Sequence, residues 1–112
     1  MSLQLEKKIV EYGGAKYALC CNMAALEELE QAYGGSMKAV FDDDVNHVSA
    51  RLFRIMLNRA RVKAGDEPVE AAEIAETYSY AMLRELDIFG MLLRAMSPEA
   101  AYQAQAEQNA KN

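Results

Sequence analysis

The chain has few of the residue types from which metal and cofactor sites are commonly built. Its 112 residues include one histidine, two cysteines and no tryptophan. Cys20 and Cys21 are adjacent, and on a strand they would point to opposite faces, so a disulfide between them is not expected. These three residues are too few to form a structural zinc site. We therefore predict reduced thiols, no bound metal and no cofactor.

Long apolar runs are also missing. The stretch 88–93 is one of the longest, and it is far shorter than the roughly 20 residues that a membrane-spanning helix requires. Charged residues at Glu6, Lys7 and Lys8 replace the apolar stretch of a secretory signal. We therefore expect a cytoplasmic protein that does not contact the membrane. The formal net charge of −5 argues against nucleic-acid binding, because affinity for phosphate depends mainly on Lys and Arg.

The sequence contains no recognisable catalytic pattern. His47 has no second histidine or cysteine with which to form a nucleophilic pair. Neither a Gly-x-Ser-x-Gly turn nor a phosphate-binding loop occurs. The run Asp42 to Asp44 lacks the ligand spacing of an EF-hand and is better explained as the acidic start of a helix. We predict no catalytic residues and a non-enzymatic role.

What is present begins with a predicted β-hairpin. Residues 5–12 and 16–21 alternate between apolar and polar side chains, and Gly13 and Gly14 suit a two-residue turn. The turn sets a register in which Val10 faces Tyr17. The expected inner face consists of Val10, Tyr12, Tyr17, Leu19 and Cys21. A lone two-stranded ribbon is only marginally stable in water, so this face must pack on helices.

Capping residues predict the first helices. Asn22 is a favourable N-cap for a helix over 23–33, and Gly34 and Gly35 suit its left-handed end. Ser36 can cap a short second helix that buries Met37, Val40 and Phe41.

A third helix, over 44–64, carries the widest apolar stripe and is expected to be central to the core. Val45 is included in that stripe. Its remaining face is basic and contains Arg51, Arg54, Arg59, Arg61 and Lys63. This face either pairs loosely with acidic neighbours or contacts an acidic partner. For the second case we single out Arg51, Arg54 and Arg61.

The region 66–96 is expected to be helical, with Pro68 in its first turn. The weak helix formers at 77–80 predict either a break or a weak point in one long helix. Apolar positions recur strongly after residue 81, and those assigned to the core are Met82, Leu83, Leu86, Phe89, Leu92 and Leu93. Methionine is frequent on surfaces that accept varied apolar helices. Met82, Met91 and Met96 are therefore the candidate partner-binding residues of this region.

These elements together predict an α+β, mostly α, fold in which an N-terminal hairpin packs on a bundle of four to five helices. Residues 1–96 form one domain. Residues 97–112 begin with a Ser97 cap and Pro98, but they have few large apolar groups. They are predicted to be a marginal helix or disordered.

The order of elements resembles a known family. A Tyr-x-Leu strand at 17–19 leads into an Asn-capped helix that reads Met-Ala-Ala-Leu-Glu-Glu-Leu-Glu and ends in Tyr-Gly-Gly. This is similar to the small tail assembly chaperones of long-tailed bacteriophages and to related gene-transfer-agent proteins. The resemblance covers residues 9–35 and is only architectural over 36–96.

The resemblance implies a non-enzymatic role in the cytoplasm of a bacterial host. Such chaperones bind the tape measure protein, a long helical polypeptide that is insoluble alone, and help to recruit tail tube proteins. Many are also made in a longer, frameshifted form. Self-association is compatible with this interpretation. The alternative is a small regulator or adaptor that binds nucleic acid through the basic face of the third helix, although the acidic net charge argues against it.

Overall fold

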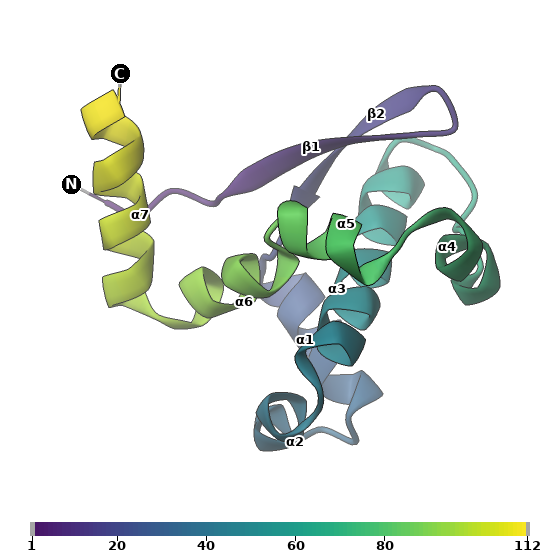
Figure 1. Cartoon of the computed structure of the whole chain (residues 1–112), viewed down its shortest axis with the longest axis horizontal. Coiled ribbons are helices and arrows are strands. Elements are labelled where there is room, and N and C mark those ends of the chain that lie inside the picture. Colours follow the sequence, from purple (N-terminus) through teal and green to yellow (C-terminus); the bar gives the residue numbers. More distant parts are fainter. Residues whose placement is uncertain (1, 112) are drawn as a thin grey trace.

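The computed structural model describes the backbone of residues 2–111 and the side chains of residues 2–108. Met1, which begins the predicted domain 1–96, and Asn112, which ends the predicted tail 97–112, lie outside the described residues. In the described part a hairpin precedes seven helices (Figure 1), which confirms the predicted α+β, mostly α, fold class. The elements are β1 (Lys7–Tyr12), β2 (Ala15–Cys20), α1 (Met23–Ala32), α2 (Met37–Asp42), α3 (Val45–Lys63), α4 (Ala71–Thr77), α5 (Tyr80–Glu85), α6 (Ile88–Met96) and α7 (Pro98–Lys111).

The hairpin forms in the predicted register. Val10 pairs with Tyr17 and Tyr12 with Ala15 across an antiparallel ribbon. Gly13 and Gly14 both have positive φ, 60° and 81°, as a two-residue hairpin turn of this type requires. On the inner face Tyr12 is half-buried and the other members are buried. The inner face therefore has the packing role that its alternation predicts.

Helix α1 begins and ends at the predicted signals. The Asn22 side-chain oxygen accepts a hydrogen bond from the Ala25 N–H at 2.9 Å. At the other end Gly34 and Gly35 have positive φ, and the Gly35 N–H donates to the Glu30 carbonyl at 2.9 Å. Glycine takes this left-handed conformation without the penalty that a Cβ brings. Leu29 on this helix is fully buried.

Helix α3 is the central element of the core. It contacts β2, α1, α5 and α6, and Figure 1 shows it passing through the middle of the molecule. Its buried side chains are Val48, Ser49, Leu52, Phe53, Ile55, Met56 and Leu57. One long helix therefore supplies the surface on which both the hairpin and the later helices pack.

The predicted start of the next helix is wrong. Pro68 precedes the helix, because residues 66–70 form no helix and α4 begins at Ala71. The side chain of Asn58 on α3 holds this segment: it accepts from the Val69 N–H at 2.7 Å and donates to the Val69 carbonyl at 3.0 Å. Val69 is buried at that point. This long-range clamp has no local sequence signal.

The remaining helical region breaks twice, which gives more helices than the four to five expected. The first break follows Thr77, within the predicted weak stretch, and Ser79 caps α5 by accepting from the Met82 N–H at 3.2 Å. The second lies at Asp87, which is left-handed with φ of 59°. A Cβ on Gly90 would lie 2.2 Å from the Asp87 carboxylate, which explains the glycine in this helix.

Helix α7 lies beside the N-terminal segment at one side of the molecule (Figure 1). Gln105 accepts from the Gln4 N–H at 3.1 Å and donates to the Ser2 carbonyl at 3.2 Å. Arg94, near the end of α6, binds both oxygens of Glu6 at 2.8 and 3.0 Å. These polar contacts connect α6 and α7 to the N-terminal segment. That residues 97–112 would fray without such contacts stays a prediction.

Several residues assigned to the core are exposed. Met82 and Leu93 lie at the surface, as do Phe41 and Val45 near the second and third helices. Phe89 and Leu86 are half-buried. The periodic pattern identified apolar positions correctly, but it did not show which of them have a packing partner in the domain.

Replacement of Leu29 by alanine tests whether the hairpin, α1 and α3 form one cooperative unit. Because Leu29 is fully buried, the change should lower the free energy of unfolding by about 2 to 5 kcal/mol. Urea titration of the variant measures the loss. Met23→Ala on the same helix is the matched control, since Met23 is 76% exposed, and it should unfold like the unmodified protein. Equal stability of the two variants would show that α1 is not part of the core.

Candidate functional site

The basic face of α3 does not form one free surface. Arg61, a candidate partner-binding residue, donates to the Tyr17 hydroxyl at 3.1 Å and to the Glu67 carbonyl at 2.7 Å. Its guanidinium also lies over the rings of Tyr12 and Tyr17, at 5.2 and 5.4 Å from their centroids. Tyr17 in turn donates to Asp66 at 2.5 Å, and this hydrogen bond raises the pKa of the Tyr17 hydroxyl. Arg61 therefore joins α3 to the hairpin and to the loop before α4.

Arg59 and Arg51 also have intramolecular partners. Arg59 pairs with Glu28 of α1 at 3.0 Å. Arg51 donates to the Ala32 carbonyl at 3.0 Å and lies 4.8 Å from the centroid of the Tyr33 ring. The expected pairing with acidic neighbours is thus found for Arg59, whereas Arg51 contacts a carbonyl and an aromatic ring. Arg51 nevertheless remains exposed at the surface.

The ring under Arg51 is part of a fixed polar contact. Tyr33 donates its hydroxyl proton to Asp43 at 2.6 Å. Burial and this hydrogen bond raise the pKa of Tyr33 to about 12. The same hydrogen bond lowers the pKa of the Asp43 carboxyl. The contact joins the end of α1 to the turn before α3, so it fixes the ring that lies against the Arg51 guanidinium.

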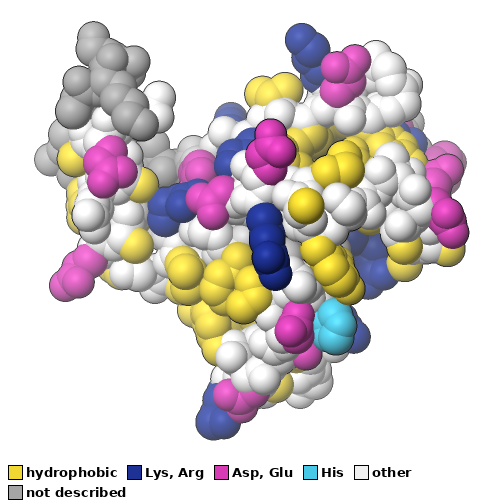
Figure 2. Space-filling view, in the orientation of Figure 1, with side chains coloured by type: hydrophobic (Ala, Val, Ile, Leu, Met, Phe, Trp, Pro, Cys, Tyr) yellow, Lys and Arg dark blue, Asp and Glu magenta, His cyan; other side chains and the backbone are white. Residues whose placement is uncertain are grey.

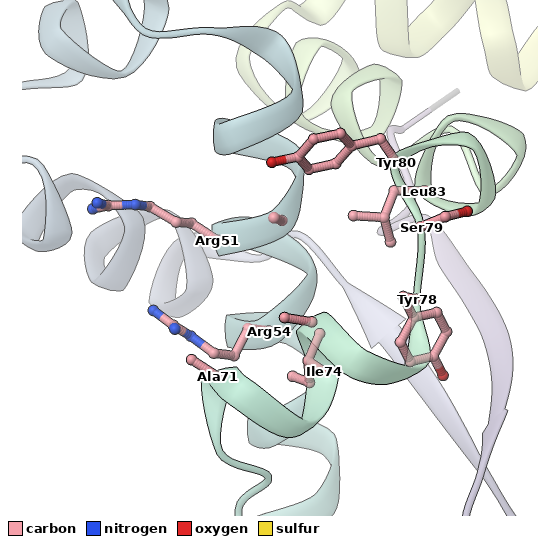
Figure 3. Close-up of a pocket in the computed structure, with 10 residues that line it drawn as sticks. Arg51, Arg54, Ala71, Ile74, Tyr78, Ser79, Tyr80 and Leu83 are labelled. Atoms are coloured by element: carbon pink, nitrogen blue, oxygen red, sulfur yellow. The ribbon is translucent and has the colours of Figure 1, made fainter.

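Arg54 is the arginine of α3 that remains available. It makes no hydrogen bond or ion pair with the part of the chain described by residues 2–108. It lies at the edge of a groove of about 370 Å³ between α3, α4 and α5 (Figure 3). The structure therefore brings Arg51 and Arg54 together beside an apolar hollow and assigns Arg61 to a separate, internal contact.

The three candidate methionines differ in exposure. Met91 is 1% exposed and belongs to the core, so it is not available to a partner in this structure. Met82 on α5 and Met96 at the end of α6 are each 43% exposed. Spacing alone could not predict which of Met91 and Met96 is buried, because α6 is apolar nearly all round. A role for Met82 in partner binding stays a prediction.

Helix α6 has a partly exposed apolar side, of which only Met96 was predicted from the sequence as a candidate partner-binding residue. Phe89, Leu93 and Met96 recur at helical spacing on one side, which lies next to the side of the buried Ile88, Met91 and Leu92. Phe89 is half-buried on this side, whereas Leu93 and Met96 are exposed. Phe41 of α2 contacts Phe89 edge to face, with ring centroids 6.3 Å apart. We call Phe41, Phe89, Leu93 and Met96 the α6 outer face. Figure 2 shows hydrophobic side chains gathered over α6 and toward α2.

This face has a signal in the sequence that could have revealed it. A helix that is hydrophobic all round is normally buried on all sides. Residues 88–96 are apolar apart from Gly90 and Arg94, yet Leu93 and Met96 are 44% and 43% exposed. Exposed apolar patches of this kind often mark interaction sites. The α6 outer face is therefore the strongest candidate for a partner-binding surface.

Reactive side chains are scattered in the described part of the chain. Residues 2–108 contain no group of three or more His, Cys, Asp or Glu side chains that could hold a metal ion. Cys20 and Cys21 are free thiols in this structure, and burial raises the pKa of Cys21 to about 11. His47 lies 3.5 Å from Asp43 at the surface. Among the described helices, none is long and apolar enough to cross a membrane.

Comparison with models of known protein families, with curated proteins and with solved structures found no match. The family that residues 9–35 resemble therefore remains a proposal.

The internal role of Arg61 predicts that the two central arginines respond differently to charge reversal. Arg61→Glu removes two hydrogen bonds and places a carboxylate near Asp66, so unfolding should become easier by about 1 to 3 kcal/mol. Arg54→Glu, the matched control on the same helix, should stay within about 0.5 kcal/mol of the unmodified protein. Urea titration measures both. If Arg61→Glu were as stable as Arg54→Glu, the contact with Tyr17 and Glu67 would have no structural importance.

Proposed function

We propose that this protein is a tail assembly chaperone of a long-tailed bacteriophage or prophage. In this role it acts without catalysis in the bacterial cytoplasm, binds the tape measure protein and assists assembly of the tail tube proteins around it. Two features support the proposal: the resemblance over residues 9–35 and the α6 outer face. The observation that carries it is the exposure of Leu93 and Met96 on an apolar helix whose other side is buried.

The α6 outer face suits an apolar helical client. Leu, Met and Phe side chains can cover the apolar stripe of an amphipathic helix in the manner of a helix-in-groove complex. Met96 adds adaptability because its side chain is unbranched and its sulfur is polarizable. Such a face accepts stripes of different sequence, as a chaperone for one long repetitive helix requires.

The size of this face predicts weak and reversible binding per copy. Covering the remaining exposed surface of a half-exposed Leu or Met contributes on the order of 1 kcal/mol. Association itself costs an estimated 4 kcal/mol or more in lost freedom of motion. One face alone is therefore insufficient, and several copies along one client, or additional contacts, are needed for a stable complex. Weak contacts of this kind also allow release when tube subunits replace the chaperone.

The alternative of a nucleic-acid adaptor has less support after the basic face is examined. Arg59 and Arg61 have intramolecular partners, so fewer guanidinium groups remain for phosphate contacts. Arg51 and Arg54 lie beside an apolar groove rather than in a continuous basic stripe.

Co-expression tests the proposed role. The tape measure protein of the same phage or prophage should remain soluble with the unmodified chain and co-elute with it on size exclusion. The double variant Leu93→Glu, Met96→Glu should lose this effect, because carboxylates on the α6 outer face cannot cover an apolar stripe. The soluble fraction of the client, measured on gels after centrifugation, gives the result.

Met23→Glu is the matched control, since Met23 is the most exposed of the large apolar residues in the described part and lies on α1. It should keep the client soluble. Circular dichroism must show that both variants are folded. A client that is equally insoluble with and without the unmodified protein would contradict the chaperone role, and full activity of the double variant would exclude the α6 outer face.

A further inference from the structure

The groove between α3, α4 and α5 has no role in the proposed function. Its floor is apolar, with Ile74 of α4 and Leu83 of α5 facing each other across it (Figure 3). The other two α4 side chains in the lining, Ala71 and Ala75, are small, which keeps the hollow open. A volume of about 370 Å³ is near the lower end of the range for ligand pockets, roughly 300 to 1,000 Å³. The hollow can therefore take one or two large apolar side chains.

The rim of the groove is positively charged on one side. Figure 3 shows Arg51 and Arg54 extending to the same side of the groove, with the Tyr80 hydroxyl also directed there. Neither guanidinium has an ion pair with the side chains described for residues 2–108. A guanidinium binds a carboxylate through strong, directional hydrogen bonds. An apolar floor and a cationic rim therefore occur side by side.

We propose that this groove docks an acidic amphipathic segment of a protein partner. A large apolar side chain of that segment enters between Ile74 and Leu83, and a neighbouring carboxylate pairs with Arg54. Arg51 and the Tyr80 hydroxyl bind a second carboxylate along the same segment. Arg51 attracts it by its charge, and the Tyr80 hydroxyl donates a hydrogen bond to it.

Two observations favour this occupant. The guanidinium groups extend away from the apolar floor. A ligand that contacts the floor and a guanidinium group together must therefore have an apolar group and a charged group separated along a chain. The whole chain is acidic, with a net charge of −5, so a pair of arginines beside an apolar groove is a local site of attraction for carboxylates and fixes the orientation of docking. A nucleic-acid duplex would pair with the arginines but leave the floor uncovered.

Synthetic peptides test the proposal on the full chain. The first probe is a short fluorescent helix with leucine along one side and glutamate beside it; in two matched probes glutamine or lysine replaces each glutamate. Fluorescence anisotropy at moderate salt should show binding of the glutamate probe, about tenfold weaker binding of the glutamine probe and none of the lysine probe. No binding of the glutamate probe, or equal binding of the glutamate and glutamine probes, would overturn the proposal.

Charge reversal at the rim gives the more specific readout. Arg54→Glu should weaken the glutamate probe at least about tenfold and create measurable binding of the lysine probe. Lys63→Glu, the same change of charge on α3 outside the groove, should alter neither probe. A general loss of structure cannot produce the gain with lysine. Equal effects of Arg54→Glu and Lys63→Glu would overturn the proposal by showing attraction to overall charge alone.

Filling the groove tests the apolar part. Ala75→Phe places a ring in the hollow and should abolish binding, whereas Ala72→Phe, an exposed position of α4 outside the lining, should not. Unchanged binding by Ala75→Phe, or displacement of the probe by a short DNA duplex, would reject a protein-docking groove. These outcomes do not depend on the α6 outer face, so the chaperone proposal and this one can fail separately.

Discussion

The packing of the hairpin on α3 is the constraint on which the rest of the structure depends. A two-stranded ribbon has too little buried surface to be stable alone, so Tyr17 and Leu19 require an apolar surface from another element. Helix α3 provides it along part of its circumference and contacts α1, α5 and α6 with the rest. Arg61 strengthens the same contact, because it donates to the Tyr17 hydroxyl and lies over the hairpin tyrosines. Arg61 therefore has a structural role, whereas Arg54 on the same helix remains available to a partner.

The broken helical region after residue 69 determines which surfaces remain uncovered. The breaks at Tyr78 and Asp87 separate α4, α5 and α6, so α5 and α6 can each pack on α3. The first separation leaves the groove beside Arg54, and the second leaves Leu93 and Met96 of α6 exposed in the described part of the chain. Both candidate surfaces thus follow from short helices that bury only one of their sides.

Local signals predicted the elements well, whereas long-range contacts decided the sites. Glycines 13 and 14 and the Asn22 cap act within a few residues, so the hairpin and α1 were correct from sequence. The predicted start of α4 was wrong, because Asn58 binds the backbone of Val69, in the segment before α4, from eleven positions away. Met91 and Met96 have the same chemistry, and only tertiary packing buries one and exposes the other. Likewise no pattern in α3 distinguishes Arg54 from Arg61, since their partners belong to other elements.

The central claim is that the α6 outer face is covered when a client is bound, and methionine oxidation tests it most directly. In the free protein, mild peroxide should oxidise Met23 and Met96 readily and Met91 slowly, in line with their exposure. In the purified complex with the tape measure protein, mass spectrometry should find Met96 protected while Met23 reacts as before. Oxidation of Met96 at the same rate in the free protein and in the complex would contradict the account.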